Sequence, residues 1–171
     1  KIFLVAVFIM PFYIAIVYAL KSPEETMKTG LAFPKHIYWA NFTEAIEVSN
    51  FWTAAKNSFI ITVVSVILLM VVCSMAAYVI ARNMRSKFFQ SFYYVFLAAM
   101  MLPFQVVMLP LYVQLKDAGL LNTRIGMILT ICGFQLAYNI FVYVGFIRNI
   151  PLEMEEAAYI DGAGKFYTFW K

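Results

Sequence analysis

Four long runs without a charged residue constrain this chain more than any other feature of its sequence. They cover residues 2–20, 57–81, 88–115 and 125–147, and they contain 19, 25, 28 and 23 residues. A helix needs about 20 apolar residues to cross the roughly 30 Å of hydrocarbon in a bilayer. The runs lack strand-like alternation, and in lipid only helices and closed barrels satisfy their own backbone hydrogen bonds. The sequence therefore predicts an all-α, polytopic membrane protein with four transmembrane helices.

Composition supports the same class. The chain is 64% hydrophobic and 13% charged, whereas soluble globular proteins carry about 25% charged residues. Its net charge of +4 is small, and gives no indication of nucleic-acid binding. The first run has no clear A-x-A-like cleavage site, so we interpret it as a span and not as a signal peptide. Because the sequence begins at Lys1 and not at Met, we expect residues upstream of it.

Basic residues give the orientation. The two sides of the predicted bundle carry seven and six Lys or Arg residues, so the totals differ little. The density differs more, since residues 82–87 contain three cations in six positions, whereas residues 21–56 spread four over 36. Basic loops mark the cytoplasmic side. We therefore predict that both ends are cytoplasmic, including residues 148–171 (the C-terminal segment). Residues 21–56 then form an extracytoplasmic loop whose Trp39 and Trp52 fit a position along the membrane surface.

The third run contains two prolines, Pro103 and Pro110, so we expect its helix to be kinked or interrupted. Transporters use such breaks where the backbone lines a cavity, although prolines are also common in membrane helices generally. Amide and hydroxyl side chains occur within the last two runs. They could border a pathway for a polar, uncharged solute, or they could form hydrogen bonds between helices or subunits. The candidates are Gln105, Gln135, Tyr138 and Asn139.

Residue types that are missing from the runs also narrow the function. No Asp, Glu, Lys, Arg or His lies in any of them, so a proton-coupled carrier would have no obvious relay. The sequence has no metal-binding, nucleophile-elbow or phosphate-binding motif, which argues against an enzyme. We predict no metal site, because the two cysteines, Cys73 and Cys132, fit small apolar packing positions. Cys73, Ala77 and Ala81 form a small-residue stripe that would let another helix approach closely.

The C-terminal segment is polar and rich in small residues. Pro151 can begin a helix, and the glutamates after it favour the positive end of that helix. Gly162 permits a chain reversal that residues with side chains resist. The alanines between them present a low surface that another protein can approach. These residues form a candidate docking site, or else a solvated linker: Glu155, Glu156, Ala157, Ala158, Asp161, Gly162 and Ala163.

A set of short motifs that runs almost from end to end carries a family resemblance. They include Ala77-Tyr78, Ala81-Arg82 and Met101-Leu102-Pro103, then Gly119-Leu120-Leu121-Asn122-Thr123, and finally Glu156-Ala157-Ala158 followed by Asp161-Gly162-Ala163. With these motifs the chain resembles the carbohydrate-type (maltose-type) permease subunits of ATP-binding-cassette importers. Their E-A-A-x-x-x-G loop matches Glu156 to Gly162, and it follows the fourth span in register.

The resemblance implies a type I importer permease fold with six spans, of which this chain would hold four and be incomplete at both ends. It implies a subunit in the bacterial cytoplasmic membrane that imports sugar without being an enzyme itself. Its partners would be a second permease, two ATPase subunits that bind ATP and Mg, an extracytoplasmic solute-binding protein and membrane lipid, but no nucleic acid. The C-terminal segment would couple to the ATPases. The alternatives are a permease for a non-sugar solute and a non-transport membrane scaffold or assembly protein.

Overall fold

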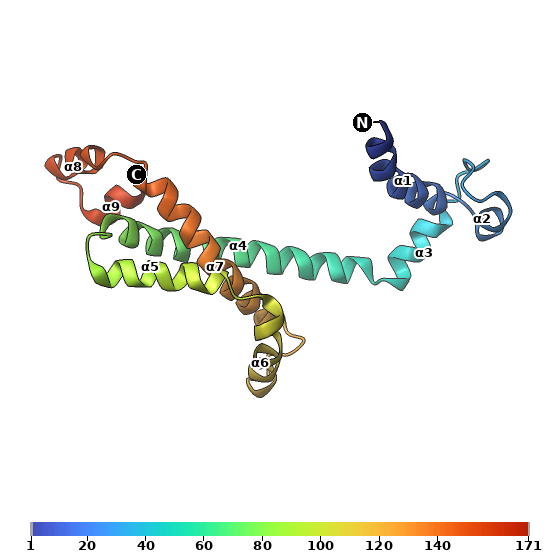
Figure 1. The fold of residues 1–171 in the computed structure, drawn as a ribbon. Helices are drawn as coiled ribbons and strands as arrows, with labels where there is room; N and C mark the ends of the chain where they lie inside the picture. The colour runs from blue at the N-terminus through green and yellow to red at the C-terminus, as the bar shows by residue number, and fades with distance from the viewer. Residues whose placement is uncertain (1, 171) are drawn as a thin grey trace. The chain divides into compact units, whose positions relative to one another are not determined.

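The structure is a computed structural model that describes residues 2–170, with side chains from Val7 onward. Within that range every regular element is a helix, as the sequence predicted. The chain divides into two compact units, residues 1–57 and 58–171. Figure 1 labels the helices along the chain. Helix α4, Phe51–Arg82, begins in the first unit and continues into the second.

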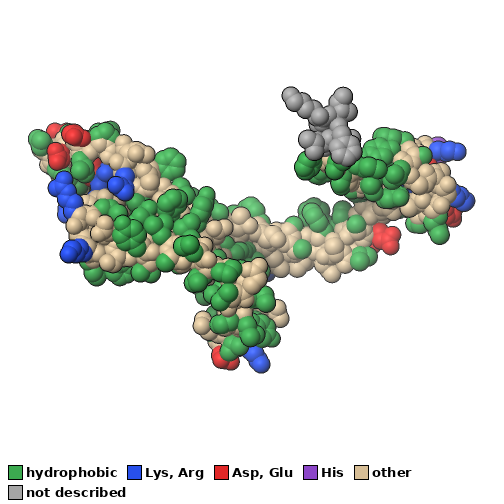
Figure 2. All heavy atoms as spheres, viewed as in Figure 1, with side chains coloured by type: hydrophobic (Ala, Val, Ile, Leu, Met, Phe, Trp, Pro, Cys, Tyr) green, Lys and Arg blue, Asp and Glu red, His purple; other side chains and the backbone are tan. Residues whose placement is uncertain are grey.

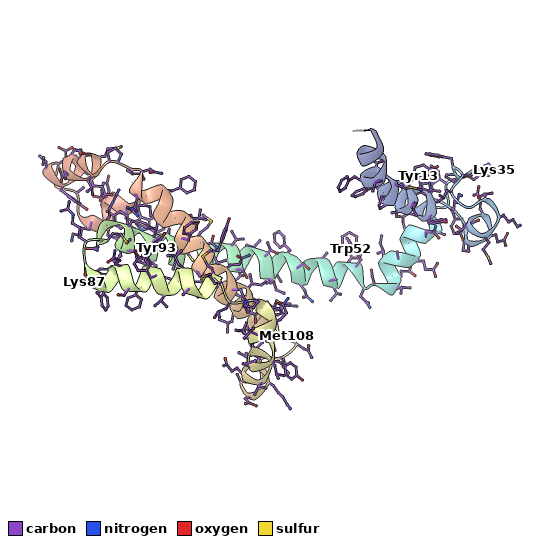
Figure 3. The ribbon with its side chains drawn as sticks, in the orientation of Figure 1. Tyr13, Lys35, Trp52, Lys87, Tyr93 and Met108 are labelled. Atoms are coloured by element: carbon purple, nitrogen blue, oxygen red, sulfur yellow. The ribbon has the colours of Figure 1, made fainter. Side chains whose placement is uncertain are left out.

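The first unit holds helices α1, Ile2–Ala19, α2, Pro23–Thr29, and α3, Ala40–Val48. Lys21, between α1 and α2, is buried and only 1% exposed. Its Nζ donates hydrogen bonds to Thr29 Oγ1 at 2.9 Å and to the Gly30 carbonyl at 2.7 Å. Tyr13, labelled in Figure 3, donates its hydroxyl to the Leu31 carbonyl at 2.7 Å. Asn41 donates to the Ala19 and Lys21 carbonyls. The segment predicted as a long loop, residues 21–56, thus contains α2, α3 and the start of α4, and side-chain hydrogen bonds join it to α1 as well as to its own backbone.

Within the described residues, two helices are long and apolar enough to cross a membrane, α4 and α7, Arg124–Arg148, and a bent pair of shorter helices would make a third if it forms one span. Helices α4 and α7 fall on the second and fourth charge-free runs. The first run corresponds to α1, of which Val7–Ala19 is counted as a shorter apolar helix. Apolar side chains remain exposed along α4 and α7, such as Phe59 at 70% and Leu129 at 53%. In a membrane protein such surfaces face lipid or partner helices.

The third run is interrupted, as its prolines predicted. Helix α5, Lys87–Met100, and helix α6, Phe104–Asp117, meet at an angle of 99° across a short break. Proline disfavours helical geometry in the residue before it and has no N–H to donate, so Pro103 starts α6 instead of continuing α5. Pro110 lies inside α6 without ending it. Each helix has 14 residues, or about 21 Å of length, so neither spans the hydrocarbon alone.

The core of the second unit lies where α4 meets α7. Cys73 and Ala77 are 0% exposed and pack with Ile140 and Val144, while Ala81 lies partly buried at the edge. The predicted small-residue stripe thus lies in the core, and Cys73 Sγ approaches the Leu136 carbonyl of α7 at 3.8 Å. Both cysteines are free thiols. Helix α5 packs against α7, and its Tyr93, labelled in Figure 3, contributes to the core from that side.

The connection before α7 is tight. Gly119 and Asn122 adopt positive φ, and the Thr123 hydroxyl caps α7 by accepting a hydrogen bond from the Gly126 N–H at 3.0 Å. A β-carbon on Gly126 would lie 2.2 Å from the Leu120 carbonyl oxygen, so only glycine lets the backbone approach this closely. The motif that the sequence singled out here therefore has a structural role in turning the chain into α7.

Candidate functional site

The C-terminal segment forms two short helices after α7. Helix α8, Leu152–Ile160, begins directly after Pro151, as the sequence predicted, and helix α9 covers Lys165–Trp170. The two helices pack on each other and lie beside the C-terminal end of α4 (Figure 1). Figure 2 shows acidic and basic side chains gathered at this end of the second unit, whereas hydrophobic side chains cover its flanks.

Gly162 ends α8 in a reversed turn. Its φ is +85°, and its N–H donates to the Tyr159 carbonyl at 3.1 Å, while the Ala163 N–H donates to the Ala158 carbonyl at 2.9 Å. This pair of bonds is a Schellman motif, which satisfies carbonyls that the helix end leaves without partners. The positive φ explains why glycine occupies this position, as the sequence predicted for the turn.

Glu155 is the most constrained side chain of α8. One carboxylate oxygen, Oε2, accepts a hydrogen bond from the Tyr78 hydroxyl at 2.8 Å, and the other, Oε1, accepts one from Arg82 Nε at 2.7 Å. Arg82 Nη2 forms an ion pair with the same Oε1. Arg82 Nη1 also donates to the Ile150 carbonyl at 3.2 Å. The side chains of Arg82 and Glu155 are each only 12% exposed.

Aromatic rings and apolar side chains surround this ion pair. Phe169 of α9 packs edge-on against the Tyr78 ring, with 5.2 Å between centroids, and the Arg82 guanidinium lies 5.9 Å from the same ring. A groove of about 540 Å³ lies beside the pair, lined by residues that include Val79 and Leu152. A second groove of about 470 Å³ also borders the pair, and its lining includes Ile147 and Ala158. The two side chains are therefore largely shielded from bulk water. An ion pair in such a place is stronger than one on an open surface.

The other predicted docking residues lie differently. Glu156, Ala157, Asp161 and Gly162 are exposed, whereas Ala158 and Ala163 are half-buried. Adjacent residues on a helix point about 100° apart, so Glu155 faces the bundle while Glu156 faces away from it. Ile160, one turn after Glu156, is 86% exposed. It extends the outward face with an apolar side chain that the sequence reasoning missed.

Sequence reasoning also missed Tyr78 and Arg82 as partners of Glu155. They are 77 and 73 residues away from it along the chain, so no local spacing links them. A weak signal was present, because a tyrosine and an arginine four residues apart share one face at the end of an apolar run.

The candidate pathway residues do not gather into one cluster. Gln135 and Tyr138 are exposed on α7, and Asn139 Nδ2 donates to the Gln135 backbone carbonyl at 2.8 Å. Gln105 is exposed on α6, next to Phe104, whose ring contacts Phe134 at 5.1 Å. The α7 residues share an outward face, which fits either a solute path or a subunit interface. Among the side chains described, no group of three or more His, Cys, Asp or Glu could hold a metal ion.

Residues 73–171 match the family model described as the binding-protein-dependent transport system inner membrane component. The match includes the α4–α7 core, α8 and its terminal turn. The chain belongs to this family. It is accordingly an all-α, polytopic membrane protein of the permease class.

Relatives of this transport family show what the chain is similar to. The diacetylchitobiose uptake system permease protein NgcG of Streptomyces coelicolor is 36% identical, over 95% of this chain and 54% of the relative. The multiple sugar-binding transport system permease protein MsmG of Streptococcus mutans is 34% identical, over 95% and 59%. The melibiose/raffinose/stachyose import permease protein MelC of Bacillus subtilis is 36% identical, over 94% and 58%. The chain thus spans between half and three fifths of the length of these relatives.

Proposed function

We propose that this chain is part of the permease subunit of an ATP-driven sugar importer in the bacterial cytoplasmic membrane. Family membership and the sugar-transport names of its relatives support the transport class and the solute class. The subunit would form the solute path together with a second permease. A solute-binding protein would deliver sugar from outside, and two ATPase subunits would bind ATP and Mg on the cytoplasmic side.

The observation that carries this proposal is the construction of α8. The helix is fixed to α4 by one half-buried carboxylate, Glu155, and it ends in a glycine turn at Gly162. This arrangement leaves Glu156, Ala157 and Ile160 exposed on the outward face. The alanine allows a partner to approach closely, and the carboxylate can accept a charge-assisted hydrogen bond from a basic residue. Such a face suits docking of an ATPase.

Orientation follows from the same proposal. Residues 82–87 join α4 to α5 and lie at the same end of the second unit as α8, with Arg85 and Lys87 exposed. A cation-rich turn favours the cytoplasmic side, where ATP is available. The outward face of α8 would then point toward the cytoplasm, together with both ends of the chain.

Deletion and complementation in the source bacterium test the solute class. The gene that encodes the full-length protein is deleted, and uptake of radiolabelled melibiose, raffinose and diacetylchitobiose is measured. These sugars are chosen because relatives are named for them. We expect uptake of at least one sugar to fall and to return with the restored gene. An ATPase subunit should co-purify with the tagged full-length protein. Unchanged uptake of all three sugars, together with no co-purifying ATPase, would refute the proposal.

A further inference from the structure

Glu155 and Glu156 are neighbours in α8, yet the structure gives them opposite surroundings. Glu156 is exposed. Glu155 is 12% exposed, and both of its oxygens are engaged by donors from α4. A carboxylate held in this way cannot turn outward to a partner without leaving an arginine half-buried and unpaired, which is costly. The two glutamates therefore cannot share one role.

The attachment of α8 to α4 depends on few contacts. Of the nine residues of α8, only Glu155 and Ala158 are not exposed. Ala158 has only a methyl group. Glu155 therefore supplies the charged contacts to α4, beside a side-chain hydrogen bond between Tyr159 and Tyr78. Its partners, Tyr78 and Arg82, lie one turn apart on α4 and approach the carboxylate from two positions, which restrains both sliding and rotation of α8.

The covalent connection between α7 and α8 is a weaker mechanical link than the contact of Glu155 with α4. It consists of residues 149–151 and ends in a proline that interrupts the helix. Arg82 also restrains this connection, through the bond from Nη1 to the Ile150 carbonyl. One arginine at the end of a predicted span thus holds both the connection before α8 and the first turn of α8. The two grooves that border the ion pair show that close packing does not replace this contact.

We propose that Glu155 is a positioning residue, which fixes α8 to the C-terminal end of α4 through Arg82 and Tyr78 so that the two move as one body. This inference rests on the proposed function, since it concerns how a push on the outward face of α8 reaches the membrane. Motion of the docked helix passes to α4 through the ion pair, and the residues 149–151 act as the hinge toward α7. Glu155 itself does not contact the ATPase.

Distance measurement between spin labels tests this link. Cys73 and Cys132 are replaced by alanine in the full-length complex, and labels are attached to cysteines at Glu153 on α8 and Val72 on α4, which are both exposed. We expect one narrow distance that stays the same before and after trapping with ATP and vanadate. Glu155→Gln should broaden that distance in both states, because the neutral amide loses the ion pair with Arg82.

Further variants separate positioning from loss of structure. Tyr78→Phe removes one hydroxyl and keeps the ring that packs on Phe169, so it should broaden the distance less than Glu155→Gln. The exchange Arg82→Glu with Glu155→Arg should restore a narrower distance than either single change. Glu156→Gln is the matched control, since it removes a neighbouring carboxylate outside the ion pair. It should leave the distance unchanged and weaken co-purification of the ATPase.

Two results would overturn the inference. One is a Glu155→Gln complex with the same narrow distance as the unmodified protein. The other is an α4–α8 distance that changes on ATP and vanadate trapping in the unmodified protein, since the helices would then move separately. Failure of the proposed function looks different. If no ATPase co-purifies while Glu155→Gln still broadens the distance, α8 is attached as argued and the importer assignment is wrong.

Discussion

The reversed turn at Gly162 allows a prediction whose size follows from the structure. A β-carbon at this position would meet no atom within 4 Å, so Gly162→Ala introduces no collision. The cost arises only from the backbone, because φ is +85° and a residue with a side chain loses about 1–2 kcal/mol in the left-handed region. That cost reduces the population of the turn relative to alternatives by a factor of about 5–30.

If the ATPase docks only on the turned conformation, its affinity should fall by a similar factor. The measurement is titration of purified ATPase onto the full-length permease in lipid nanodiscs. Gly162→Asn should lose less, since asparagine tolerates this conformation better than alanine. Gly162→Val should lose more, because a β-branched residue tolerates it worst.

Gly164 provides the matched control for this series. It does not have a left-handed φ, and a β-carbon there also meets no atom within 4 Å. Gly164→Ala should therefore leave the affinity nearly unchanged, and it should insert into the membrane as well as Gly162→Ala does. Equal affinities for Gly162→Ala and Gly164→Ala would show that the conformation of the turn does not matter for docking, and would refute the reasoning.

Three other outcomes are expected. In a variant without native cysteines, an impermeant thiol reagent should label a cysteine at Lys28 in whole cells but not one at Ser86; the reverse pattern would invert the orientation. The double change Gln135→Leu and Asn139→Leu should lower sugar uptake without preventing insertion, and unchanged uptake would remove both from the path or interface. Ala157→Trp, on the exposed face of α8, should block co-purification of the ATPase by overlap; normal co-purification would place docking elsewhere.

The lengths of the charge-free runs predicted where helices occur better than they predicted where each helix begins and ends. The run 125–147 agrees with α7 to within one residue at each end, because Arg124 and Arg148 end both the apolar run and the helix. Helix α4 instead begins at Phe51, six residues before its run. Lys56 interrupts the charge-free stretch without interrupting the helix, since a lysine is compatible with helical structure outside lipid. That the chain forms four spans stays a prediction. Among the described residues, two helices are long and apolar enough to span, or three if α5 and α6 form one bent span, and Val7–Ala19 is a shorter apolar helix.

The angle between α5 and α6 was harder to predict from the sequence than the position of the break between them. Pro103 indicated where the third run would break, and the structure breaks there. The 99° angle between α5 and α6 depends on what each half packs against, such as the contact of Phe104 with Phe134 of α7. Such contacts join residues far apart in the sequence, and no local pattern encodes them. The same reason hid Tyr78 and Arg82 from any reading of α8 alone.

The division of labour between Glu155 and Glu156 is a matter of helical phase. Both are acidic residues in the first half of α8, and composition cannot distinguish them. The start of the helix after Pro151 sets the phase, and a rotation of about 100° between neighbours sends one carboxylate to Arg82 and the other outward. Deleting one residue between Pro151 and Glu155 would instead bring Glu156 to the position that faces Arg82 and turn Glu155 outward. The proline that begins α8 thus decides which glutamate pairs with Arg82 and which is exposed.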